Sequence, residues 1–158
     1  MLFQARRYAE AEVASRQALA LDSTNESARA DLGLLLAYQH RFPEAFATFR
    51  VIDTTSFGLA YAYGLAGRRT EAREIQRRLE RLTRTSYVSP LSFAHIAISL
   101  GDTAQALDWL ERAYRERTFL LPFLLHPVYD PLRSQPRFQR IVRDIGVTIP
   151  PASGPPRR

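Results

Sequence analysis

Apolar residues recur along much of this chain at the three- and four-residue spacing of amphipathic helices. Ser89 followed by Pro90 is a typical helix start, because serine accepts a free backbone N–H and proline suits the first helical position. The pattern predicts an all-α fold. The helices that we expect lie at residues 2–21, 26–39, 43–52, 56–66, 69–83, 90–100, 103–116, 118–127 and 138–145.

These helices form repeating units. Four alanines, each preceded by Glu or Gln, lie 34, 27 and 34 residues apart: Ala11, Ala45, Ala72 and Ala106. Small residues stand twelve positions before the last three: Gly33, Ala60 and Ala94. Five positions before them stand His40, Gly67 and Gly101. We interpret each unit as two antiparallel helices that approach closely at the small residues. A tight turn joins them, and glycine suits that turn because it adopts positive φ without a steric penalty.

The 27-residue spacing is seven residues short of a full unit, which is nearly two helical turns. Such a deletion shortens a helix without rotating its buried face. We therefore expect a short second helix in the second unit, at 43–52, followed by a turn at 53–56.

The repeat decays after residue 116. The apolar stretch 118–127, a turn at 130–136 and the amphipathic stretch 138–145 predict a cap over the last apolar face, within 118–146. Gly146 is a typical helix-terminating residue. We expect one repeat domain over 1–146, followed by a flexible proline-rich tail at 147–158.

Composition narrows the classes of function. The chain has 158 residues, no cysteine and a net charge of +6. Its apolar stretches are much shorter than the roughly 20 residues of a membrane-spanning helix, so we expect a cytoplasmic protein without membrane contact. Motifs of nucleotide binding, metalloprotease or serine-hydrolase chemistry are absent, and the three histidines have no metal-ligand spacing. We expect neither an enzyme nor a bound cofactor or metal.

The helix at 69–84 is rich in arginine. Arg69, Arg73, Arg77 and Arg81 repeat every four residues, a spacing that suits phosphate contacts. No aromatic residue in this helix is placed to stack a base. We favour a solvated surface here, and keep a nucleic-acid-binding module as the alternative.

The segments 61–73 and 99–114 resemble the turn and second helix of tetratricopeptide repeats, and the resemblance covers about residues 1–116. The order of 87–90, 101–114 and 130–138 is similar to the C-terminal tetratricopeptide region of bacterial signalling and regulatory proteins. The resemblance implies a right-handed α-α superhelix that binds proteins and carries no catalysis. The chain starts within a unit, which leaves open whether an effector domain precedes residue 1.

The first helices of the units are expected to line a concave face that binds a peptide or helix of a partner protein. The candidate binding residues are Leu34, Tyr38, Phe57, Tyr61, Leu65, Leu91, His95 and Ser99. Two alternatives are that the cap or tail covers part of this face, or that these residues pack between helices. The N-terminal half-unit, with Phe3, Ala11 and Ala18, also suggests self-association through that end.

Overall fold

The computed structural model describes residues 5–51, 56–118 and 124–148. In these ranges every regular element is helical: α1 (Tyr8–Leu21), α2 (Glu26–Tyr38), α3 (Phe42–Phe49), α4 (Phe57–Leu65), α5 (Arg69–Leu82), α6 (Pro90–Ser99), α7 (Thr103–Arg115), the 3-10 helix η1 (Pro127–Leu132) and α9 (Pro136–Ile145). The predicted all-α fold is confirmed for this part of the chain. The turn expected at 53–56 and most of the tail fall outside it.

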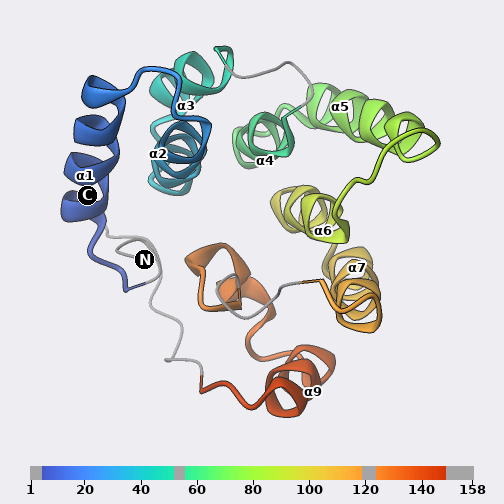
Figure 1. The fold of residues 1–158 in the computed structure, drawn as a ribbon. Coiled ribbons are helices and arrows are strands. Elements are labelled where there is room, and N and C mark those ends of the chain that lie inside the picture. Colours follow the sequence, from blue (N-terminus) through green and yellow to red (C-terminus); the bar gives the residue numbers. More distant parts are fainter. Residues whose placement is uncertain (1–4, 52–55, 119–123, 149–158) are drawn as a thin grey trace.

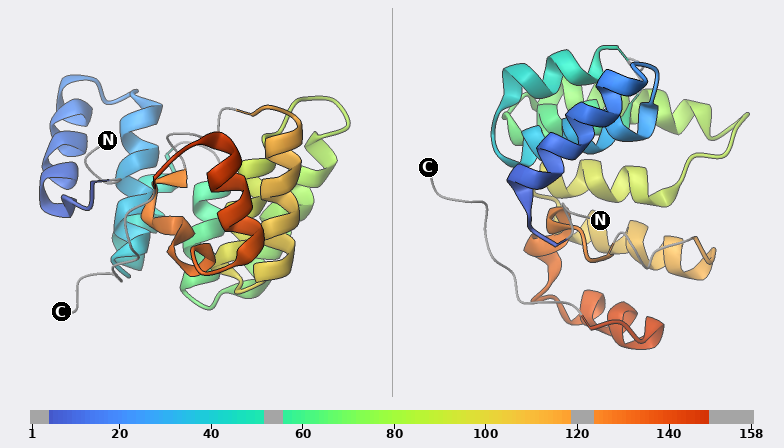
Figure 2. Two further views of the ribbon diagram at one scale, coloured as in Figure 1. Left: turned by 90° about the horizontal axis from the view of Figure 1, so that it is seen from below. Right: turned by 60° about the vertical axis from the view of Figure 1, so that its left-hand side comes forward.

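The helices follow one another around a ring (Figure 1), with α2, α4 and α6 on its inner side and α3, α5 and α7 outside. Consecutive pairs α2–α3, α4–α5 and α6–α7 pack together, and α2, α4 and α6 pack in sequence. The 3-10 helix η1 lies inside the ring, on the side of α6 and α7, and α9 packs on α7. Figure 2 shows the same arrangement of helices from two other sides.

The turns within the pairs have the predicted left-handed backbone. His40, Gly67 and Gly101 have φ values of 60°, 76° and 75°. In each turn the next residue donates its N–H to the carbonyl five positions back, which is the bond of a Schellman motif. Gly146 ends α9 with a φ of 76°. The repeated column of turn residues therefore identified a real feature of the backbone.

The small residues of the repeat lie where helices meet. Ala45, Ala60, Ala72, Ala94 and Ala106 are fully buried. A Cβ at Gly33 would collide with the ring of Phe49, which fills the space between α2 and α4. The shortened helix α3 has eight residues, whereas α5 has 14 and α7 has 13, so the expected contraction is also confirmed.

The C-terminal region differs from the prediction in its regular structure. The first part of the turn expected at 130–136 belongs to η1, which starts at Pro127 and ends at Leu132, and the turn itself occupies residues 133–135. In a regular α-helix the ring of Pro131 would clash with the carbonyl four residues earlier, at Pro127, which favours a short 3-10 helix here. Of the helix expected at 118–127, residues 119–123 lie outside the described ranges.

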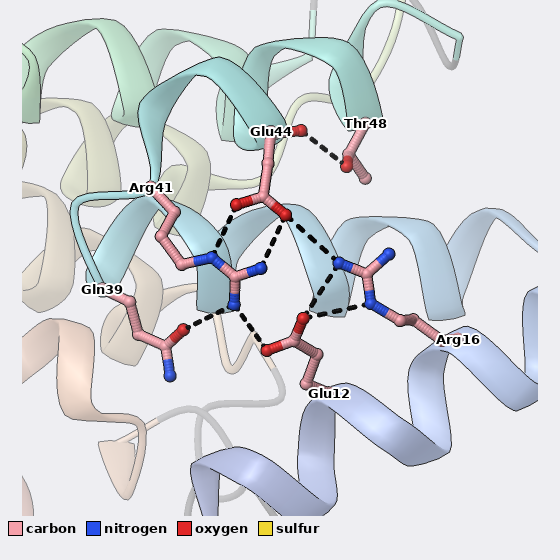
Figure 3. Close-up of polar contacts among 6 residues, drawn as sticks. All are labelled: Glu12, Arg16, Gln39, Arg41, Glu44 and Thr48. Atoms are coloured by element: carbon pink, nitrogen blue, oxygen red, sulfur yellow. Dashed lines mark hydrogen bonds and ion pairs between the residues drawn. The ribbon is translucent and has the colours of Figure 1, made fainter.

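Charged side chains attach α1 to the next pair (Figure 3). Arg41 of the turn before α3 binds Glu12 of α1 at 2.6 Å, and it also binds Glu44 of α3 at 2.6 Å. Arg16 bridges Glu12 and Glu44 from the other side, at 2.9 and 3.3 Å. Among the residues of α1, Ala11 is the one that is buried, and Tyr8 and Leu19 pack on the core as partly buried residues, so the contact combines ion pairs with a small apolar surface.

Candidate functional site

The candidate binding residues come from three inner helices but do not line an open groove. Leu34, Tyr38, Tyr61, Leu91, His95 and Ser99 are buried, and Phe57 and Leu65 are half-buried. Leu91 packs in the C-terminal core with α7, η1 and α9, whereas Leu34 packs in the core formed by the earlier helices. The structure thus divides the predicted set between two clusters, and η1 covers part of the inner face.

Aromatic rings form the centre of this site. His95 of α6 stacks on Phe57 of α4 with ring centroids 5.2 Å apart, and Tyr61 meets it edge-on at 6.2 Å. Tyr129 of η1 lies on another side of His95, also at 5.2 Å. Burial lowers the pKa of His95 to about 4, against a weaker opposing effect of the Leu91 carbonyl. At neutral pH His95 is therefore an uncharged member of an aromatic cluster.

Asp130, the next residue of η1, is held by three side chains. Arg6 donates to its two carboxylate oxygens at 2.9 and 2.8 Å, which makes a bidentate pair. Arg133 donates at 2.6 Å, and the Tyr38 hydroxyl lies 3.4 Å away. The Asp130 hydrogen bond is the main cause of a raised pKa at Arg6. Because the Arg6 and Asp130 side chains are only 15% and 11% exposed, solvent screens this pair weakly.

A pocket of about 300 Å³ remains between η1 and the inner helices. Its walls include Tyr38, Tyr61 and Leu65 on the inner side and Pro127 and Asp130 on the η1 side. These walls are mostly apolar apart from the Asp130 carboxylate and His40 at the edge. The pocket suits an apolar or aromatic group of a ligand that lies next to Asp130, a carboxylate that is paired with arginine.

Ser99 has a packing role in this arrangement. Its hydroxyl donates to the Ile96 carbonyl at 2.8 Å, and it lies against Gly64 so closely that a Cβ there would collide with it. Ser99 therefore allows α4 and α6 to approach each other.

Sequence reasoning missed Arg6, Tyr129 and Asp130 as part of this site. Arg6 and Asp130 are 124 residues apart, and no periodicity connects them. The available signal was an apolar, proline-flanked segment in the expected cap, which predicted burial of the segment without indicating the surface it covers.

The arginine-rich helix lies apart from this site, on the outer side of the ring (Figure 1). Arg78 pairs with Glu74 at 2.6 Å, and Arg69 donates to the Leu100 carbonyl at 2.9 Å. Arg73, Arg77 and Arg81 are exposed, and they make no ion pair with the residues that the structure describes.

At the N-terminal end, Phe3 lies outside the described ranges. Ala11 is buried in the core, and Ala18 is half-buried. Part of the surface predicted to self-associate is therefore already covered. Self-association through this end stays a prediction.

In the part of the chain that the structure describes, no helix has the length and apolar character to cross a bilayer, and no group of three acidic or histidine side chains is arranged to hold a metal ion.

No family model, curated protein or solved structure matches this chain. The class that the fold defines is an all-helical protein built from antiparallel helix pairs. A more particular assignment rests on the repeat pattern and on the chemistry of the inner face.

Proposed function

We propose that the chain is a non-catalytic protein-interaction scaffold of the tetratricopeptide type, within a bacterial signalling or regulatory protein of the cytoplasm. It binds a short peptide or helix of a partner on the inner face of a right-handed superhelix of helix pairs. The observation that carries the proposal is the apolar pocket at Tyr38, Tyr61 and Leu65, which opens beside the Asp130 carboxylate. The pattern of turns with left-handed residues 34 positions apart, as at Gly67 and Gly101, supports the repeat class.

Selection of displayed random peptides on the purified chain tests this function. We expect selected peptides to lose at least tenfold in affinity for Leu65→Glu, because a charge at the pocket wall opposes an apolar ligand. Arg77→Glu is the matched control, since it places the same side chain on the exposed outer helix. Equal binding to both variants, or a loss confined to Arg77→Glu, would contradict the inner-face assignment.

The exposed Arg73, Arg77 and Arg81 favour a second candidate, a nucleic-acid-binding module on the outer side. This function requires an affinity for DNA or RNA that falls steeply with salt and that drops when the three arginines are replaced by glutamine. Absence of binding at low salt would dispose of it.

A further inference from the structure

The inner face already holds a peptide segment, which is η1 of the same chain. Pro127, Val128, Tyr129 and Leu132 of η1 are buried. Val128 packs with the core of the earlier helices, whereas Tyr129 and Leu132 pack with α6, α7 and α9. The residues that receive η1 come from distant parts of the sequence, so their arrangement around this segment shows which chemistry the face accepts.

The segment presents one aromatic side chain to the face. Tyr129 is 0% exposed, and its ring centroid lies 5.2 Å from that of His95 on α6 and 6.2 Å from that of Phe138 on α9. One aromatic residue thus makes a ring contact with an inner helix and another with α9, and such contacts add to the free energy of burial.

The residue after the tyrosine presents a carboxylate. The guanidinium of Arg6 donates two hydrogen bonds to this carboxylate, and the Tyr38 hydroxyl lies beside the same carboxylate. Bidentate geometry recognises a carboxylate specifically and discriminates against an amide, which offers one acceptor oxygen. Aromatic and acidic positions are therefore adjacent in the accepted ligand.

The fit of η1 is incomplete in two respects. The Tyr129 hydroxyl is buried without a hydrogen-bond partner among the described residues, and a buried hydroxyl without a partner is less stable than a hydrogen-bonded one. Beside η1 the pocket of about 300 Å³ is unfilled by protein. A partner segment that satisfies the hydroxyl position or fills this pocket has an advantage over the internal segment.

We infer that η1 is an internal ligand of the inner face, and that the partner is a peptide in which an aromatic residue is followed directly by Asp or Glu. The inference rests on the proposed function, since it names the partner that this face takes. Such a partner displaces η1, and its apparent affinity equals its intrinsic affinity multiplied by the fraction of molecules in which η1 is detached.

The test uses the full chain and a fluorescent synthetic peptide with the sequence of residues 126–133. The full-length variant Tyr129→Ala with Asp130→Asn weakens the internal ligand but keeps Arg6, Tyr38 and His95. We expect this variant to bind the peptide at least tenfold more tightly than the unaltered chain. A matched control, Tyr87→Ala with Asp144→Asn, makes the same chemical changes at exposed positions and should leave the affinity unchanged.

Two further comparisons test the recognised chemistry. Addition of Arg6→Ala to the double variant should remove most of the gain, and so should a peptide with asparagine in place of its aspartate. If the double variant keeps its helical content and binds the peptide no better than the unaltered chain, the inference is overturned. Loss of cooperative folding in both the double variant and the milder Asp130→Asn also overturns it, because a segment required for folding cannot be displaced by a partner.

These results are separable from those for the proposed function. Library-selected peptides that depend on Leu65, together with no gain in the double variant, reject the internal ligand and leave the interaction scaffold standing. A gain in the double variant without any Leu65-dependent peptide supports the internal ligand and rejects the assignment of peptide binding to the pocket wall at Leu65.

Discussion

The two ends of the helical array are closed by different interactions. At the N-terminal end, α1 buries Ala11, packs the smaller apolar surfaces of Tyr8 and Leu19 on the core, and forms the ion pairs of Glu12 and Arg16 with Arg41 and Glu44. At the C-terminal end, η1, α9 and Leu124 before them bury large apolar side chains: Leu124, Val128, Tyr129, Leu132, Phe138 and Ile141. Burial of this kind contributes roughly 1.5–3 kcal/mol per large side chain, whereas exposed ion pairs contribute about 0–1 kcal/mol. The C-terminal closure should therefore be much the stronger one.

The largest expected effect is the loss of stability in acid, because two buried histidines lie at the C-terminal closure. Burial lowers the pKa of His95 to about 4 and that of His126 to about 3. Below pH 6.5 the unfolded chain takes up protons that the folded chain does not bind, so stability is present above pH 6.5 and is lost as the pH falls. Each buried histidine should remove on the order of 1 kcal/mol of unfolding free energy per pH unit below 6.5.

Thermal unfolding followed by circular dichroism between pH 7 and 4.5 measures this loss. His95→Phe keeps an aromatic ring in the cluster and should remove about half of the slope. A Tm that stays constant from pH 6.5 to 4.5 would show that these histidines are not buried as described.

Phe138→Ala tests the apolar closure. Phe138 is buried between α9 and η1, so its truncation should cost about 3–5 kcal/mol of unfolding free energy in urea titration. Leu21→Ala at the other end of the array is the matched control. Leu21 is 92% exposed, and the expected change is below about 0.5 kcal/mol. Similar costs for both variants would remove the contrast between the two ends.

Substitutions in the turns should change the unfolding free energy by smaller amounts and in opposite directions. His40 has positive φ where the next two units have glycine, so His40→Gly should stabilise the chain by about 1 kcal/mol. Gly67→Ala should destabilise it by about the same amount, and a Cβ there meets no atom within 4 Å, which isolates the backbone effect. Unfolding in urea measures both, and effects of the same sign would contradict a shared turn geometry.

Glu12→Gln should have the smallest effect. It breaks the ion pairs of Glu12 with Arg41 and Arg16, at a cost of about 0.5–1 kcal/mol that shrinks as salt is added. Urea unfolding at 0.05 M and 1 M salt provides the comparison. A cost above about 2 kcal/mol, independent of salt, would mean that α1 is held as firmly as the C-terminal closure.

Local features of the fold could be predicted from the sequence. Repeated alanines located the helix contacts, the column with His40 and Gly67 located the turns, and the missing seven residues located the short helix α3. Each of these depends on interactions between residues close in sequence or in register within the repeat.

The site could be predicted only in part for the same reason. Tyr38, Tyr61 and His95 are buried; His95 contacts Tyr129 of η1, and Tyr38 and Tyr61 pack in the core and line the pocket beside η1. Because η1 lies outside the repeat, the spacing of the repeat does not indicate which residues η1 contacts. The pairing of Arg6 with Asp130 is a long-range contact of this kind, and composition or spacing contains no signal for it.

A double-mutant cycle on Arg6 and Asp130 tests the central claim, which is that η1 lies on the inner face and is held there by the N-terminal segment. Urea unfolding of Arg6→Ala, Asp130→Asn and the combined variant yields the coupling energy of this pair. A bidentate, largely buried pair predicts a coupling of about 1–3 kcal/mol. Additive costs, with a coupling below about 0.3 kcal/mol, would contradict the contact and with it the placement of η1.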